Sequence, residues 1–262
     1  MTRRGFRMLV AAAGLTAMAG GAQAAQCGNT AAGFEAWKDQ FAAEARGRAS
    51  AASLQALAGT SYSTATISAD RGQKSFKLSL DQFLAKRGGT TIVSRGRALK
   101  AQNAALFASI EQRYGVPAGP LIAIWGMETG FGAVKGNVNT LSAVATLAYD
   151  CRRSEFFTDQ LYAALKLVDA GIITPATRGA AHGEVGHTQF LPKNVLTYGV
   201  GGSLDSAPVA LNSTANFLKG HGWQRGAGYQ PGEPNFSAIQ GWNAAGVYQR
   251  AIALLGAKID GQ

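Results

Sequence analysis

The spacing of apolar residues is the feature that most restricts how this chain can fold. In several alanine-rich segments apolar side chains recur every three or four positions, which is typical of one face of an amphipathic helix. One such stripe consists of Phe34, Trp37, Phe41 and Ala45. The same spacing predicts helices over residues 99–114, 120–127, 141–149, 154–170, 209–219 and 237–255. Strand signals are sparse, and the best is residues 90–93. The sequence therefore predicts a mainly α fold with at most a small β element.

The N-terminus has the features of an export signal. Three arginines within the first seven residues precede residues 8–20, an uncharged and largely apolar stretch that is too short to anchor a chain in a bilayer. Residues 22–24 form a small-x-small triplet of the kind that signal peptidase cleaves. We therefore expect residues 1–24 to be removed on export, and the adjacent pair of arginines also resembles a twin-arginine signal.

The rest of the chain, residues 25–262, has a length that suits a single domain. No later segment is apolar for long enough to form a membrane anchor. Cys27 is preceded by Gln26 instead of a small residue, so we do not expect a lipoprotein. The formal net charge of +10 suits an acidic polymer such as nucleic acid, anionic lipid or the cell-wall network, and export argues against nucleic acid.

The chain has two cysteines, Cys27 and Cys151. In an oxidising compartment such an isolated pair favours a disulfide. Closing a loop of this length stabilises a fold by about 4–5 kcal/mol in the loop-entropy model. The three histidines, which are His182, His187 and His221, have no metal-ligand spacing with the cysteines. We expect no metal and no cofactor.

A glutamate at the end of an apolar helix is the first candidate for chemistry. Glu128 follows residues 124–127 and precedes the glycine-rich residues 129–132. Burial raises the pKa of a carboxyl, so Glu128 is expected to stay protonated as a general acid near neutral pH. Gly130 and Gly132 are expected to let a bulky polymer approach. The alternative is an ordinary glutamate at a helix end.

Three further blocks accompany Glu128. Residues 183–192 form a glycine turn that ends in Gln-Phe-Leu-Pro, and an Asn-Phe pair at residues 216–217 precedes His-Gly-Trp at 221–223. Trp242 and Asn243 are followed by Tyr248. In this order the four blocks resemble the lytic murein transglycosylases of the lysozyme superfamily, most closely the B-type branch. The resemblance extends from about Phe34 to the C-terminus, and it includes the Asp-Arg pair at residues 70–71 and the Arg-Arg pair at residues 152–153.

The resemblance implies a lysozyme-like α+β fold and a periplasmic enzyme. A helical N-terminal part, residues 25–100, would pack on a catalytic core, residues 101–262. The substrate would be peptidoglycan glycan strands, cut between N-acetylmuramic acid and N-acetylglucosamine. Glu128 would act as general acid and then as base while the muramic 6-hydroxyl closes a 1,6-anhydro ring. A hydrolytic, lysozyme-like muramidase and a non-catalytic wall-binding protein remain as alternatives. The sequence identifies no partner in wall synthesis or secretion.

The resemblance also suggests residues that bind the glycan. Gln189 and Asn243 can hydrogen-bond acetamido or hydroxyl groups. Thr129, next to Glu128, belongs to the same block. Four aromatic residues offer flat faces for sugar rings, with core packing as the alternative: Phe131, Phe217, Trp242 and Tyr248. For Phe217 the two interpretations are equal.

The charged residues of these blocks have open roles. Arg152 and Arg153 would meet carboxylates of the peptide stem, or they are solvated surface residues. Glu184 is expected to be a turn residue or to support a neighbour in preference to being a second catalytic group. B-type relatives often carry an Asp-rich calcium loop, but the corresponding residues 198–205 contain one carboxylate, so we predict no calcium.

Overall fold

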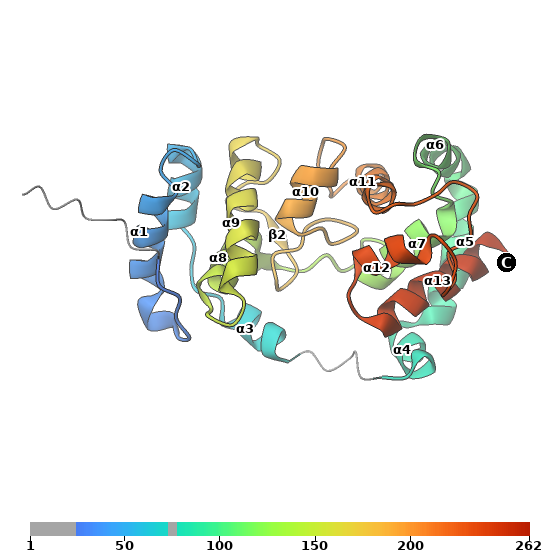
Figure 1. Cartoon of the computed structure of the whole chain (residues 1–262), viewed down its shortest axis with the longest axis horizontal. Coiled ribbons are helices and arrows are strands. Elements are labelled where there is room, and N and C mark those ends of the chain that lie inside the picture. The colour runs from blue at the N-terminus through green and yellow to red at the C-terminus, as the bar shows by residue number, and fades with distance from the viewer. Residues whose placement is uncertain (1–24, 73–77) are drawn as a thin grey trace, which may run out of the picture.

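The computed structural model describes residues 25–72 and 78–262 (Figure 1). The predicted export signal, residues 1–24, lies outside the described residues. Before the small sheet the helices are α1 (Phe34–Glu44), α2 (Ala51–Ala58), α3 (Thr64–Arg71), α4 (Leu80–Arg87), α5 (Gly89–Gln102), α6 (Ala104–Tyr114) and α7 (Ala118–Thr129). From the sheet onward they are α8 (Thr140–Tyr149), α9 (Ser154–Asp169), α10 (Pro192–Tyr198), α11 (Ala207–Gly220), α12 (Phe236–Trp242) and α13 (Gly246–Asp260). A short 3-10 helix, Ala31–Gly33, precedes α1.

The predicted mainly α fold is confirmed. The sheet consists of two antiparallel two-residue strands, β1 (Val138–Asn139) and β2 (Arg178–Gly179). Serine side chains begin three of the early helices, because their oxygens accept the backbone N–H groups that a first helical turn leaves unpaired. These caps are Ser50 for α2, Ser63 for α3 and Ser79 for α4.

The predicted strand at residues 90–93 is wrong, because this segment lies in α5. Gly88 adopts a left-handed φ of 70° that ends α4 and starts α5. Ile92 is buried there and lies against Gly126 of α7. Tertiary packing on a neighbouring helix therefore overrides the β preference of these β-branched residues.

Helix boundaries differ from the sequence prediction in three places. Residues 99–114 belong to two helices that meet at Asn103, whose side chain donates to the Leu99 carbonyl at 2.9 Å. The last predicted helix is also two helices, α12 and α13, separated at Asn243. The short helix α10 was not predicted, although Pro192 at its first position favours a helix start.

Two groups of helices meet in the middle of the molecule (Figure 1). Helices α1, α2, α3, α8 and α9 pack together and form what we call the stapled half. Helices α4, α5, α6, α7, α11, α12 and α13 form the α7 half, in which α7 packs against α5 and α13. Helix α10 contacts both α9 and α11. The N-terminal residues are thus divided, because α1–α3 pack in the first group and α4–α5 in the second.

The predicted disulfide between Cys27 and Cys151 is present and gives the stapled half its name. It ties the segment before α1 to the turn between α8 and α9. Two backbone hydrogen bonds accompany it, from Gly28 N to Tyr149 O at 2.9 Å and from Cys151 N to Gly28 O at 3.3 Å. Among the residues that the structure describes, no helix combines the length and the apolar character needed to cross a membrane.

Candidate active site

Helix α7 carries Glu128 from the core to the surface. Residues 118–127 are all buried, and Glu128 is the first residue of the helix with partial exposure. A helix that is apolar all round is stable only inside a protein. Gly130 then ends α7 with a left-handed φ of 57°. A carboxyl therefore emerges from the hydrophobic core at a fixed position.

Glu128 opens into a cleft of about 340 Å³ between the α7 half and the segment that leads from β2 into α10. The cleft is lined by Glu128, Ala180, Glu184, Gln189, Phe190, Leu191, Asn194, Trp242 and Asn243. Helices α7 and α12 form one wall, and the loop between β2 and α10 forms the other. A larger hollow of about 540 Å³ lies between α4, α5 and α13. The smaller cleft holds the Glu128 carboxyl, whose pKa is raised by burial, so it is the stronger candidate for chemistry.

The Glu128 carboxyl is held close to its neutral form. Burial is the largest cause, and it raises the pKa of Glu128 from 4.5 to about 7. Trp242 Nε1 donates to Glu128 Oε1 at 3.1 Å, which lowers this pKa, as does Tyr248, while the negative charge of Glu184 raises it. At neutral pH the carboxyl can both give and take a proton, as a general acid–base requires.

Tyr248 supports Glu128 from below the cleft. The ring is buried in α13 and lies edge-on to Phe83, with ring centroids 5.7 Å apart. Its buried hydroxyl forms no hydrogen bond of ordinary geometry, but it interacts with the Glu128 carboxyl. The pKa of Tyr248 is raised, mainly by burial and next by the negative charge of Glu128. The ring face that we expected to meet a sugar is therefore covered, because the core packs against it.

Thr129 fixes the loop and does not line the cleft. Its Oγ1 donates to the His187 carbonyl at 2.7 Å and accepts from Gly132 N at 2.8 Å. Trp125 Nε1 donates to His187 Nδ1 at 2.9 Å. These bonds attach the loop between β2 and α10 to α7. We expected Thr129 to bind substrate, and the structure places its side chain in a buried position between the loop and α7.

The glycines after Glu128 also serve the loop. Gly132 has a φ of 84°, and a Cβ there would come within 2.2 Å of the His187 ring. Gly130 ends α7, and neither glycine lines the cleft. At Gly132 the space that we expected to admit a polymer is therefore filled by the His187 ring, whereas Gly130 is exposed.

Gln189 lines the cleft in a strained conformation. Its φ is 55°, and its Nε2 donates to Gly186 O at 2.8 Å and to Lys135 O at 3.3 Å. Within the described ranges, Phe131, with a φ of 66°, is the one other non-glycine residue with a positive φ. Backbone strain of this kind gathers at functional sites, where the surrounding structure enforces it.

Trp242 and Asn243 complete the cleft at the end of α12. Asn243 Oδ1 accepts from Ala245 N at 2.9 Å, and its carbonyl accepts from Gln249 Nε2 at 2.8 Å. These bonds set the break between α12 and α13. They hold the Trp242 side chain beside Glu128 and the Asn243 side chain at the cleft surface.

Phe217 and Phe131 pack in the core, so for both residues the structure favours the packing alternative. Phe217 stacks on His221 with centroids 3.9 Å apart and meets Trp242 edge-on at 5.1 Å. Phe131 meets Trp125 edge-on at 5.4 Å. Both side chains are buried and neither lines the cleft. Phe217 therefore acts on the site by holding Trp242.

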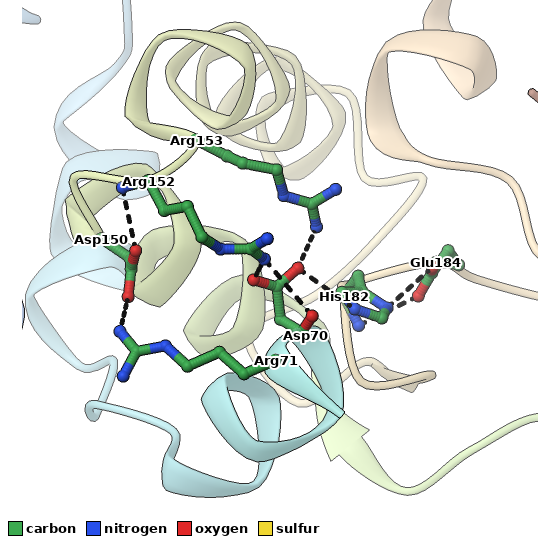
Figure 2. A network of polar contacts seen from close by, with 7 residues as sticks. All are labelled: Asp70, Arg71, Asp150, Arg152, Arg153, His182 and Glu184. Atoms are coloured by element: carbon green, nitrogen blue, oxygen red, sulfur yellow. Dashed lines mark hydrogen bonds and ion pairs between the residues drawn. The ribbon is translucent and has the colours of Figure 1, made fainter. Parts of the chain in front are cut away.

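Arg152 and Arg153 do not line the cleft either. Figure 2 shows both side chains beside Asp70. Both guanidinium groups pair with the buried carboxylate of Asp70. Arg71 pairs with Asp150 at 2.7 Å on the other side of this turn. The arginines join α3 to the turn between α8 and α9, and their contact with substrate carboxylates stays a prediction.

Five lining residues were not predicted as site residues: Ala180, Glu184, Phe190, Leu191 and Asn194. Phe190 and Leu191 belong to the block that contains Gln189, and Asn194 lies in the first turn of α10. Among the described residues no group of three or more His, Cys, Asp or Glu side chains is placed to hold a metal. Asp205, in the loop considered for calcium, pairs with Lys135 at 2.6 Å.

Comparison with known proteins adds independent information. Residues 33–233 match the family model described as "Transglycosylase SLT domain". Membrane-bound lytic murein transglycosylase B of Escherichia coli is 36% identical over 139 residues, which cover 47% of this chain. The match spans 38% of the length of that relative.

Solved structures share the fold. A crystal structure of SltB3 from Pseudomonas aeruginosa in complex with NAG-NAM-pentapeptide is 29% identical, with a TM-score of 0.79, and the match covers 87% of this chain and 80% of that one. The Escherichia coli lytic transglycosylase Slt35 in complex with bulgecin A has a TM-score of 0.75 at 22% identity, covering 90% and 96% of the two chains. The latter comparison shows the fold alone.

Proposed function

The chain belongs to the transglycosylase SLT domain family, and from this premise we propose that it is a peptidoglycan lytic transglycosylase. It cleaves the β-1,4 bond between N-acetylmuramic acid and N-acetylglucosamine without water and leaves 1,6-anhydro-muramic ends. The observation that carries this proposal is Glu128: a carboxyl with a pKa of about 7, held by Trp242 in a cleft that also contains Gln189 and Asn243. The complex of SltB3 with NAG-NAM-pentapeptide supports a glycan as the ligand of this cleft.

One carboxyl suffices for both halves of the reaction. Protonated Glu128 gives its proton to the glycosidic oxygen as the bond from that oxygen to C1 of the muramic residue breaks. The positive charge that develops at C1 is relieved when the muramic 6-hydroxyl oxygen attacks, and the hydroxyl proton passes to the Glu128 carboxylate. The acid is thereby regenerated, and atoms and charge balance without a water molecule.

Three other side chains would hold the glycan for this step. Gln189 and Asn243 line the cleft with amide groups that suit acetamido and hydroxyl groups, and Trp242 adds an aromatic surface. We further propose that residues 25–262 act as one catalytic domain in the periplasm, after removal of residues 1–24. The partners on this proposal are glycan strands; nucleic acid and an integral membrane anchor have no part in it.

The test is mass spectrometry of purified peptidoglycan digested with the mature protein, with Glu128→Gln as the matched control. Fragments ending in 1,6-anhydro-muramic acid from the wild type alone would support both the reaction and the residue. Fragments with reducing ends, heavier by one water, would make the protein a hydrolase. Fragments from neither protein, with retained binding to the sacculus, would favour a wall-binding protein.

A further inference from the structure

Glu184 is a second carboxylate in the cleft that the proposed reaction does not use. It lines the same cleft as Glu128, and its side chain is about one quarter exposed, at 23%. It comes from the opposite wall, in the loop that follows β2. The charge of an isolated surface glutamate is screened by solvent and has little effect on its neighbours. Glu184 differs because its backbone and its carboxylate are both held in place.

The backbone around Glu184 is held by paired hydrogen bonds. Ala180 N donates to the Glu184 carbonyl at 2.9 Å, and Gly183 N donates to the Ala180 carbonyl at 3.1 Å. Directly after Glu184, Val185 and Phe190 exchange two hydrogen bonds, at 2.9 and 3.1 Å. The Cα atom of Glu184 is therefore fixed relative to the loop that carries Gln189.

The carboxylate of Glu184 is held as well (Figure 2). His182 N donates to Glu184 Oε2 at 3.0 Å, and His182 Nδ1 lies 3.3 Å from Glu184 Oε1. The other ring nitrogen, Nε2, lies 3.6 Å from Asp70 Oδ1. Asp70 is itself fixed by Arg152 and Arg153. We call Asp70, Arg152, Arg153 and His182 the Asp70 cluster; it orients Glu184 from behind.

Charged and titratable groups reach Glu128 from three directions. Glu184 faces it from the loop, Tyr248 from α13 and Arg87 from α4. Arg87 Nη1 donates to the Met127 carbonyl at 3.2 Å, and the charge of Arg87 favours ionised Glu128. Glu184 acts in the opposite direction, because a second negative charge disfavours ionisation. Among the described residues no cation lines the cleft itself, and Arg153, a cation that interacts electrostatically with Glu184, lies behind it.

We propose that Glu184 is a positioning residue for Glu128: held across the cleft by the Asp70 cluster, its negative charge keeps the Glu128 carboxyl in the proton-donating form. The catalytic consequence rests on the proposed function, but the electrostatic effect does not. Removing the charge of Glu184 lowers the pKa of Glu128. Since the reaction begins with protonated Glu128, the alkaline limit of activity then moves to lower pH.

The experiment is an NMR titration of the Glu128 carboxyl carbon in protein labelled at glutamate, with the Glu128→Gln spectrum used to assign the signal. It compares the wild type, Glu184→Gln and a control, Glu111→Gln. The control removes the same charge from an exposed position on α6. We expect the midpoint of Glu128 to fall by about half a pH unit or more in Glu184→Gln, and to stay unchanged in Glu111→Gln.

An unchanged midpoint in Glu184→Gln, or an equal fall in the control, would overturn the proposal. If Glu184→Gln does not fold, Glu184→Ala serves as the second variant with the same expected direction. The titration needs no substrate, so a protein that cuts no peptidoglycan can still show the effect of Glu184. Conversely, anhydro products together with an unmoved midpoint would reject this inference and leave the proposed function intact.

Discussion

The two halves of the molecule are stabilised by different interactions. The stapled half contains the disulfide, the ion pairs of Asp70 and Asp150, and a cluster of aromatic rings that includes Phe34, Trp37 and Tyr149. The α7 half depends on apolar packing around one buried helix. Glu128 belongs to the second half, and the loop that faces it is fixed by polar contacts to both halves, through His187 to α7 and through His182 to Asp70. The pKa of Glu128 is thus raised mainly by burial, whereas Glu184 on the opposite wall is oriented by charged and polar side chains.

Replacing Glu128 by glutamine tests the chemistry of the α7 half without altering its packing. Glu128→Gln keeps the shape of the side chain and removes the titrating proton. We expect release of soluble fragments from peptidoglycan to fall by about 10³-fold or more, since proton transfer at both steps depends on this carboxyl. Circular dichroism should show an unchanged helical fold. Activity within tenfold of the wild type would mean that another group supplies the proton.

A double substitution of the two cysteines removes the disulfide of the stapled half. We expect Cys27→Ser with Cys151→Ser to reduce the free energy of unfolding by about 2–5 kcal/mol in a denaturant titration, because the unfolded chain regains the entropy of a long loop. The native state and its activity at 25 °C should persist, since Glu128 lies in the other half. A double variant as stable as the oxidised wild type would show that the disulfide contributes nothing here.

The stability of the α7 half is expected to depend on pH through Glu128. The folded-state pKa of Glu128, about 7, lies above its unfolded value of 4.5. The neutral carboxyl therefore contributes stability that is complete below pH 4.5 and is lost as the pH rises through 7. Glu128→Gln removes this loss, and we expect it to be more stable than the wild type by about 1–3 kcal/mol at pH 8, with no gain at pH 4.

Thermal unfolding of both proteins across this range measures the difference. Activity of the wild type should decline above about pH 7 for the same reason, because the acid loses its proton. An equal gain in stability at pH 4 and pH 8 would assign the effect to packing instead of titration.

The smallest expected effect concerns the attachment of the loop to α7. Thr129→Val removes the donor to His187 O and the acceptor of Gly132 N without changing the side-chain shape. We expect a loss of about 1–2 kcal/mol in unfolding free energy, together with reduced activity, because two partly buried backbone groups lose a partner. Thr197→Val, whose exposed hydroxyl donates to Lys193 O, is the matched control. An equal loss of unfolding free energy in both variants would show that the hydrogen bonds of Thr129 to the loop add no more stability than an exposed hydroxyl does.

Much of the fold follows from local pattern, and its errors have physical causes. The apolar stripe of Phe34, Trp37 and Phe41 was found because all three residues face one core. Residues 90–93 were misassigned because their β preference yields to packing of Ile92 on α7, a contact that sequence separation conceals. The fold class could be predicted because apolar stripes are a local pattern. The strand positions could not be predicted because they depend on contacts between residues far apart in the sequence.

The site was only partly accessible. Glu128, Gln189, Trp242 and Asn243 were all predicted as site residues through the resemblance of their blocks to the transglycosylase family, and all four line the cleft. Tyr248, Phe217 and Arg153 belong to the same or neighbouring blocks, but a sequence shows residue type and not orientation, so their buried or paired positions could not be read. Nothing in the sequence indicates that the Asp70 cluster forms behind Glu184.

Glu128 lies in the last turn of α7, where the aligned peptide dipoles of a helix leave about half a negative charge. This background charge comes from the backbone alone, so no side-chain substitution that preserves the helix removes it. It opposes ionisation of the carboxyl in the same direction as burial does. Arg87 weakens it locally, because it donates to the Met127 carbonyl, one of the last carbonyls of the helix. The helix direction itself thus biases the acid toward retaining its proton until a substrate oxygen is in position to accept it.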